Sequence, residues 1–274
     1  MTKTMTGSRG AIAVAVFLAL PRPLAGQSIA ERVAAVSDGT VHMSFAARPG
    51  VCGNGVNSIS LGHGSRISWN GNSRSYNDEW SSDACEFGPV RVSLDVRDGD
   101  VTELRAYVGG EWRSGQGGRS SVTDIGLVPA RAAADYLLTI AARVKGEAAR
   151  DAIFPATLAD SVVVWPKLLE IARDENRPRE TRKSAVFWVG QAAGEAATAG
   201  LDSLVRFDEV EREIKEQAIF ALSQRPEDEG VPALIRVVRT NPDPELKKKA
   251  LFWLGQSGDE RALALFEELL LSSQ

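Results

Sequence analysis

The chain has 274 residues, of which 43% are hydrophobic and 25% are charged, as in an ordinary soluble protein. Its 32 Lys and Arg residues against 36 Asp and Glu residues give a net charge of -4, which argues against a nucleic-acid-binding protein. Only two His and two Cys are present, so metal sites and His-dependent triads are hard to build. No catalytic constellation is visible, and we predict no cofactor and no enzymatic activity.

The first 26 residues have the features of an export signal. Lys3 and Arg9 precede an uninterrupted apolar run from Ala11 to Leu20, and Leu24-Ala25-Gly26 supplies small residues for cleavage. The apolar run is about half the length of a membrane-spanning helix. We therefore predict that residues 1–26 are a signal peptide, and that the mature chain is periplasmic or secreted and has no membrane span. An uncleaved anchor is the alternative.

Residues 27–130 are rich in Gly, Ser and Asn and predict a small β-rich module. Ser28-Ile29-Ala30-Glu31 is a capping-box pattern, which begins a short helix. Apolar and polar residues alternate from Val90 to Arg97, which indicates a strand with one buried face. Asp98-Gly99 is a turn signal, and Val101 to Val108 supplies the returning strand. The module is therefore predicted to contain a small antiparallel sheet.

The two cysteines of the chain, Cys52 and Cys85, both lie in this module. In an oxidising compartment we expect them to form a disulfide. Closing the loop between them should stabilise the fold by about 3 to 4 kcal/mol. A reactive thiol or a metal-binding pair is the alternative, although the chain has neither a Cys-x-x-Cys motif nor a His cluster beside them.

Other motifs in the module give weaker signals. Gly53-Asn54-Gly55 lacks the third glycine of a phosphate-binding loop. An acidic loop carries four carboxylates that are candidates for an extracellular calcium site, namely Asp78, Glu79, Asp83 and Glu86. A solvated acidic loop is the alternative. His42 and His63 have no partner at ligand spacing.

From residue 131 onward the chain is rich in Ala, Leu, Glu and Arg and contains an internal repeat. Segments that begin at Ala185, Ala218 and Ala250 read AVFWVGQ, AIFALSQ and ALFWLGQ, so the repeat length is 32 to 33 residues. Each segment is followed by a polar turn and a second apolar stripe, which predicts a helical hairpin.

The same pattern extends towards the N-terminus. Trp165-Pro166-Lys167-Leu168-Leu169 is an earlier copy of the second stripe, with proline in the first helical turn. We predict about four helical hairpins. The first is expected to use Ala132 to Val144 as its leading helix and to be lengthened by Gly146 to Pro155.

The repeated aromatic positions are expected to pack in the core. This applies to Phe187, Phe220 and Phe252, and also to Trp188 and Trp253, for which a role as ligand platforms is the alternative. The glutamines that end the three segments are expected to bond turn carbonyls, with a functional glutamine row as the alternative.

The repeat length, the Ala-x-Phe-Trp-x-Gly-Gln segment and the Pro-containing second helix resemble the HEAT-repeat family over about residues 131–274. The resemblance implies an α-α superhelix of HEAT-like helical hairpins. The fold class is therefore predicted as α+β, a small β-rich N-terminal module followed by this superhelix. The N-terminal module resembles no family that we recognise. HEAT proteins bind many unrelated partners, so the resemblance alone does not define a function.

In HEAT proteins the second helices usually line the concave side, and here they carry charged residues. Two aligned positions are charged: Glu170, Arg206, Arg236 and Glu267 at the first, and Arg173 and Arg239 at the second. We predict an exported scaffold or adaptor that binds another protein through these residues. The alternatives are an extracytoplasmic ligand-binding module or enzyme with its site in the Gly-rich module, and a membrane-tethered sensory or assembly factor. In these alternatives, the charged residues of the second helices form only salt bridges between repeats and bind no partner.

Overall fold

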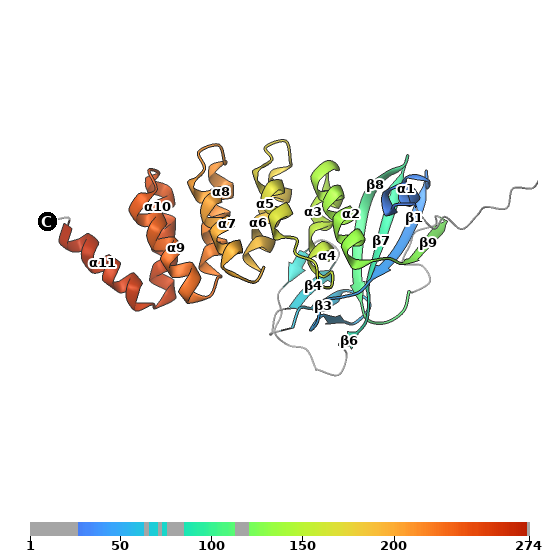
Figure 1. Cartoon of the computed structure of the whole chain (residues 1–274), viewed down its shortest axis with the longest axis horizontal. Coiled ribbons are helices and arrows are strands. Elements are labelled where there is room, and N and C mark those ends of the chain that lie inside the picture. Colours follow the sequence, from blue (N-terminus) through green and yellow to red (C-terminus); the bar gives the residue numbers. More distant parts are fainter. Residues whose placement is uncertain (1–26, 63–65, 71–72, 76–84, 113–120, 273–274) are drawn as a thin grey trace, which may run out of the picture.

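The computed structural model describes residues 27–62, 66–70, 73–75, 85–112 and 121–272. Strands lie in the N-terminal part, and a row of helices leads away from them to the C-terminal end (Figure 1). This is the predicted α+β arrangement, a β-rich part followed by a superhelix of helical hairpins. The predicted signal peptide, residues 1–26, lies outside the described residues.

The first described helix is α1 (Ile29–Ala34), and its predicted capping box is present. The backbone N–H of Glu31 donates to Ser28 Oγ at 3.2 Å, and the N–H of Ser28 donates to Glu31 Oε2 at 2.8 Å. Both bonds satisfy N–H groups that a helix start leaves without a partner.

The larger sheet has the strand order β8-β7-β1-β9 in the described chain. Its strands are β1 (Gly39–Phe45), β7 (Val90–Arg97), β8 (Asp100–Val108) and β9 (Val122–Leu127). The predicted hairpin is confirmed, since Asp98 and Gly99 form its turn with φ angles of 52° and 80°. However, β9 pairs parallel with β1, so the sheet is mixed and not antiparallel throughout. The chain between β8 and β9 is long enough to return a strand in the parallel direction.

The polar face of β7 is buried in its first half, whereas the sequence pattern predicted that this face is solvated. Arg91 and Ser93, on the polar face, are each 4% exposed. This face is covered by Trp112, which stacks on His42 with ring centroids 3.7 Å apart and lies 5.1 Å from the Arg91 guanidinium. From Val90 to Leu94 the alternation of side chains therefore separates two buried faces of different chemistry, and Arg97 at the end of the strand is exposed.

A second sheet lies beside β8 and has the order β5-β4-β3-β2-β6 among the described residues. Its strands are β2 (Cys52–Gly53), β3 (Ser58–Ser60), β4 (Arg66–Asn70), β5 (Ser73–Ser75) and β6 (Glu86–Phe87). The predicted disulfide joins Cys52 to Cys85, with their Cα atoms 5.3 Å apart. It fastens β2 to the residue before its neighbour β6. Gly53 permits close contact between the sheets, since a Cβ there would lie 2.5 Å from the Val108 carbonyl oxygen.

The helices after β9 form two layers. They are α2 (Ala130–Arg143), α3 (Glu147–Asp151), α4 (Ile153–Thr157), α5 (Trp165–Arg173), α6 (Arg179–Gly190), α7 (Glu195–Arg206), α8 (Arg212–Ser223), α9 (Glu227–Thr240), α10 (Pro244–Ser257) and α11 (Glu260–Ser272). One layer stacks α6, α8 and α10, and the other stacks α5, α7, α9 and α11. The repeated segments occupy α6, α8 and α10, as predicted. Among the described helices, none has the length and apolar character needed to cross a bilayer.

The first hairpin differs from the prediction. We expected Ala132 to Val144 as its leading helix, but that segment is α2, which packs against α5 in the second layer. The leading position belongs to α3 and α4, which pack against α6. Residues 146–155 are therefore not an insertion. They form most of the first-layer helix of this hairpin.

Pro155 explains why the sequence pattern did not predict this first-layer helix. Ala152-Ile153-Phe154 is a further copy of the repeated segment, 33 residues before Ala185. Pro155 stands where the later copy has Trp188. Because proline has no N–H to bond the carbonyl of Asp151, the helix is interrupted and divides into α3 and α4.

The aromatic positions pack between successive first-layer helices. The ring of Trp188 lies 5.0 Å from that of Phe154, and the ring of Trp253 lies 5.2 Å from that of Phe220. Phe252 is 57% exposed, so its predicted place in the core is wrong. No described helix follows α10 in the first layer to cover it.

Candidate functional site

The exposed surface of α5, α7, α9 and α11, here called the second-helix face, carries the predicted charged residues. Their alignment needs one correction. Arg206 lies 33 residues after Arg173 and 33 before Arg239, so these three arginines share one position of the repeat. Ser203, and not Arg206, takes the position that Arg236 occupies in the following repeat.

The centre of the second-helix face consists of two arginines that share one carboxylate. Arg206 Nη2 lies 3.2 Å and Arg236 Nε lies 3.3 Å from Asp202 Oδ2. The Asp202 side chain is 5% exposed, whereas those of Arg206 and Arg236 are 58% and 50% exposed. A buried carboxylate thus fixes two guanidinium groups from neighbouring repeats, and the cluster of three keeps a net positive charge.

The remaining arginines of the face are also held by neighbours. Arg173 Nη2 donates to Ser203 Oγ at 2.7 Å, and its guanidinium lies 5.2 Å from the Phe207 ring. Arg239 Nη2 lies 2.5 Å from Glu268 Oε2 on α11, and both side chains are more than half exposed. Each arginine is therefore oriented by a contact that leaves much of it open to solvent.

Acidic residues also lie on the first and last helices of the second-helix face. Glu170 on α5 pairs with Lys167 of the same helix, and Glu267 is exposed on α11. The structure therefore brings Arg206 and Arg236 together and places Glu170 and Glu267 on the first and last helices of the face. The two arginines that share Asp202 therefore lie on α7 and α9, whereas α5 carries both Glu170 and Arg173.

A buried arginine that the sequence pattern did not reveal joins successive repeats. Arg225, in the turn between α8 and α9, has a side chain only 5% exposed. Its guanidinium donates to five acceptors, namely the carbonyl oxygens of Gly190, Ala192 and Gly194, Thr198 Oγ1 and Glu229 Oε2. The hydroxyl of Thr198 and then Arg225 hold the pKa of Glu229 below its usual range. This cluster is structural, since its hydrogen bonds are satisfied within the chain.

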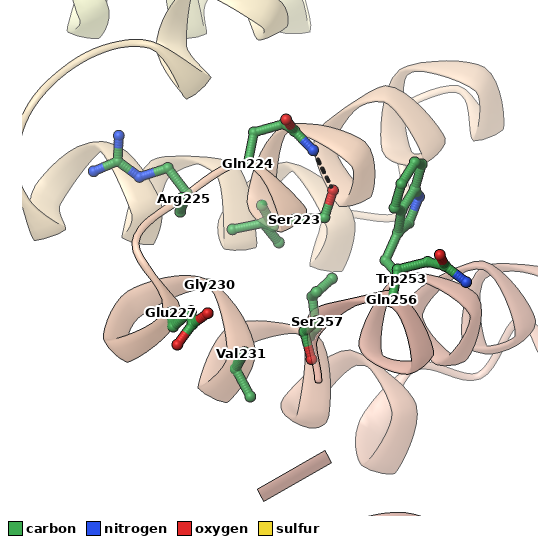
Figure 2. Close-up of a pocket in the computed structure, with 11 residues that line it drawn as sticks. Ser223, Gln224, Arg225, Glu227, Gly230, Val231, Trp253, Gln256 and Ser257 are labelled. Atoms are coloured by element: carbon green, nitrogen blue, oxygen red, sulfur yellow. Dashed lines mark hydrogen bonds between the residues drawn. The ribbon is translucent and has the colours of Figure 1, made fainter. Parts of the chain in front are cut away.

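A pocket of about 390 Å³ lies between α8, α9 and α10 (Figure 2). Its polar wall contains Ser223, Gln224, Gln256 and Ser257. Gln224 Nε2 donates to Ser223 Oγ at 3.2 Å, and not to a turn carbonyl as the sequence suggested. Figure 2 shows the Arg225 side chain extending away from this pocket.

A second pocket, of about 220 Å³, occupies the corresponding place two repeats earlier. Its wall contains Trp188 and Gln191, which correspond to Trp253 and Gln256 in the pocket of Figure 2. The repeated tryptophans therefore both pack against the preceding repeat and line pockets. The earlier pocket differs in receiving Arg48 from the β-rich module.

The candidate metal ligands give no site in the part of the chain that the structure describes. No group of three or more His, Cys, Asp or Glu residues there is placed to hold a metal ion. Asp78, Glu79 and Asp83 lie outside the described residues, as does His63. Glu86 accepts a hydrogen bond from a backbone N–H at 2.7 Å.

Comparison with known families supports the repeat architecture. Residues 205–274 match the family of HEAT repeats. Helices α8 to α11 lie in this range, and α3 to α7 continue the same two-layer packing. The matched range does not include the β-rich module. A comparison with curated proteins finds no match to the chain. HEAT repeats are commonly scaffolds for protein interaction, because stacked hairpins present an extended surface.

Proposed function

We propose that this protein is an exported, non-catalytic scaffold or adaptor that binds another protein through its second-helix face. The observation that carries the proposal is the Asp202 cluster, in which a buried carboxylate orients two largely exposed arginines. A planar guanidinium makes two hydrogen bonds to a carboxylate. The partner surface is therefore expected to carry Asp or Glu side chains opposite Arg206 and Arg236.

The packing of the same helices supports this assignment. Leu201, Leu204 and Leu234 are at most 1% exposed, so the apolar stripes of α7 and α9 are committed to the core. Charged side chains remain on the outside to select a partner. Phe207, which is 49% exposed beside Arg173, adds an aromatic contact. Aromatic and arginine side chains dominate the energetics of protein interfaces.

Charge reversal tests the proposal. Arg206→Glu and Arg236→Glu should each weaken partner binding by more than about 1 kcal/mol, or about fivefold in Kd. Arg212→Glu is the matched control, because Arg212 is 59% exposed on α8, in the other layer, and is paired with Asp243 at 3.0 Å. It should leave binding intact. The neutral variant Arg236→Gln shows whether binding weakens because the attraction to the partner is lost or because a new glutamate is repelled by Asp202. The melting temperature of each variant verifies that it is folded. Unchanged affinity after reversal of Arg206, Arg236 and Arg239 together would contradict the proposal.

Export is a separate part of the proposal. It is supported by the basic, apolar and small-residue order of residues 1–26 and by a disulfide, which persists in oxidising compartments. The mature chain is expected to begin at Gln27. Intact mass of protein recovered from the cell envelope measures this, and a mass that retains Met1 to Gly26 would contradict cleavage.

A further inference from the structure

The pocket of about 220 Å³ lies where the β-rich module meets the first helical hairpin. Arg48 reaches it from the segment after β1, and that segment is fastened to the end of α4. The backbone N–H of Arg48 donates to the carbonyl of Leu158 at 2.8 Å, and the N–H of Asp160 donates to the carbonyl of Ala46 at 3.0 Å. The backbone of Arg48 is therefore held in place independently of its side chain.

The charge of Arg48 is not neutralised by the residues that the structure describes. Its side chain forms no ion pair or hydrogen bond with any of them, and its Nε is buried without an acceptor. Burial lowers the pKa of the guanidinium, which nevertheless stays protonated at neutral pH because its ordinary pKa is so high. A partly buried cation without a counter-charge is unfavourable. An anion bound beside it would remove that penalty.

The rest of the wall is mainly apolar and aromatic. Trp165 is the first residue of α5, and Val163, which is 71% exposed, lies two residues before it. Trp188 is 4% exposed, and its buried indole N–H lacks an acceptor among the described residues. The N-cap residue of α5, Val164, has no capping side chain, and a helix start favours negative charge. One cationic group therefore stands beside apolar surface in a space suited to a small ligand.

We propose that this pocket binds a carboxylate attached to a small apolar group, either a free organic acid or the C-terminal residue of a peptide. The carboxylate pairs with Arg48, and the apolar group lies against Trp165 and Val163. The site goes beyond the proposed scaffold function, because it uses none of the charged residues of the second-helix face.

Calorimetric titration of the mature full-length chain tests the assignment with two matched probe pairs. The first is phenylacetate against phenylacetamide, and the second is a short peptide ending in Phe with a free or an amidated C-terminus. At least one acid is expected to bind, and its amide to bind at least tenfold more weakly. Binding of phenylacetate alone identifies a free acid as the source, and binding of the peptide alone identifies a C-terminus. Both results support the site.

Variants then assign the binding to Arg48. Arg48→Gln should weaken binding of the acid at least tenfold, while Arg97→Gln, at an exposed arginine of the same module, should not. Val163→Asp, at an exposed position, should also weaken binding at least tenfold and provides a second variant if Arg48→Gln fails to fold. The proposal is overturned if no probe binds at 10 mM, if an amide binds as well as its acid, or if a folded Arg48→Gln chain binds unchanged.

Discussion

Replacement of Arg225 by methionine tests how successive repeats are held together. The substitution keeps a long apolar side chain but removes every hydrogen bond of the guanidinium. It leaves the Glu229 carboxylate, which is 15% exposed, with Thr198 as its remaining side-chain partner. It also removes the donor to the carbonyls of Gly190, Ala192 and Gly194.

The expected loss of stability follows from this geometry. Breaking a buried ion pair by removing one partner costs about 3 to 5 kcal/mol. The lower end applies here, because Glu229 keeps Thr198 and the carbonyls lie in a turn that water can reach. We expect a loss of about 3 kcal/mol, which corresponds to a fall in melting temperature of about 6 to 12 °C for a chain of this size.

Urea unfolding followed by circular dichroism measures the effect. Arg212→Met is the control, because it removes an arginine that also pairs across repeats but is 59% exposed. It should cost less than about 1 kcal/mol. The Arg225→Met and Glu229→Gln double variant should lose less stability than the sum of the two single variants. Equal effects of Arg225→Met and Arg212→Met would refute the reasoning from burial.

Three further outcomes follow from the structure. Burial lowers the pKa of His42 from 6.5, so the unfolded chain takes up a proton before the folded one. The contribution of neutral His42 to the free energy of unfolding is therefore fully present above about pH 6.5. It is lost as the pH falls below this value, by up to about 1.4 kcal/mol per pH unit. His42→Phe should flatten this slope in urea titrations between pH 5 and 7.5. Replacing Cys52 and Cys85 by serine should lower the free energy of unfolding by about 3 to 4 kcal/mol, measured by thermal unfolding without reductant, and no change would show that the bond is absent in solution. Gly255→Ala should stabilise α10 by about 0.5 to 1 kcal/mol, because the added Cβ would have its nearest neighbour at 3.9 Å. Gly230→Ala should destabilise the fold, because its Cβ would lie 2.4 Å from a carbonyl oxygen of α8.

The helices could be predicted from the sequence where their apolar pattern is periodic. The segments that begin at Ala185, Ala218 and Ala250 define α6, α8 and α10, because each buries the same side of a helix against the next repeat. The copy at Ala152 was missed, since Pro155 replaces the tryptophan and breaks the helix. A search at the 33-residue interval without the tryptophan would have found it.

The β-rich module was harder to predict, because long-range contacts determine it. Strands β2, β3, β5 and β6 contain only two or three residues each, which is too short for any periodicity to appear. The parallel pairing of β9 with β1 depends on a partner about 80 positions away in the sequence. The capping box at Ser28 and the turn at Asp98-Gly99 were predicted because their signals are local.

Residues of the candidate sites were also predictable only where their pattern recurs along the sequence. Arg206, Arg236 and Arg239 could be found because they recur on second helices. Asp202, which orients two of them, was not singled out, since its role depends on contact between α7 and α9. The pocket at Arg48 has no pattern in the sequence, because its wall combines a segment after β1 with three helices more than 100 positions later.

Site-specific photo-crosslinking tests partner binding by the second-helix face most directly. Benzoylphenylalanine placed at Phe207, which is 49% exposed beside Arg173, is expected to form a crosslink to one partner protein in cells. The same probe at Phe252, which is 57% exposed on α10 in the other layer, is the matched control and should not. Adding Arg236→Glu should abolish the crosslink from Phe207. Equal crosslinking from both positions, or a crosslink from Phe207 that survives Arg236→Glu, would contradict partner binding by this face.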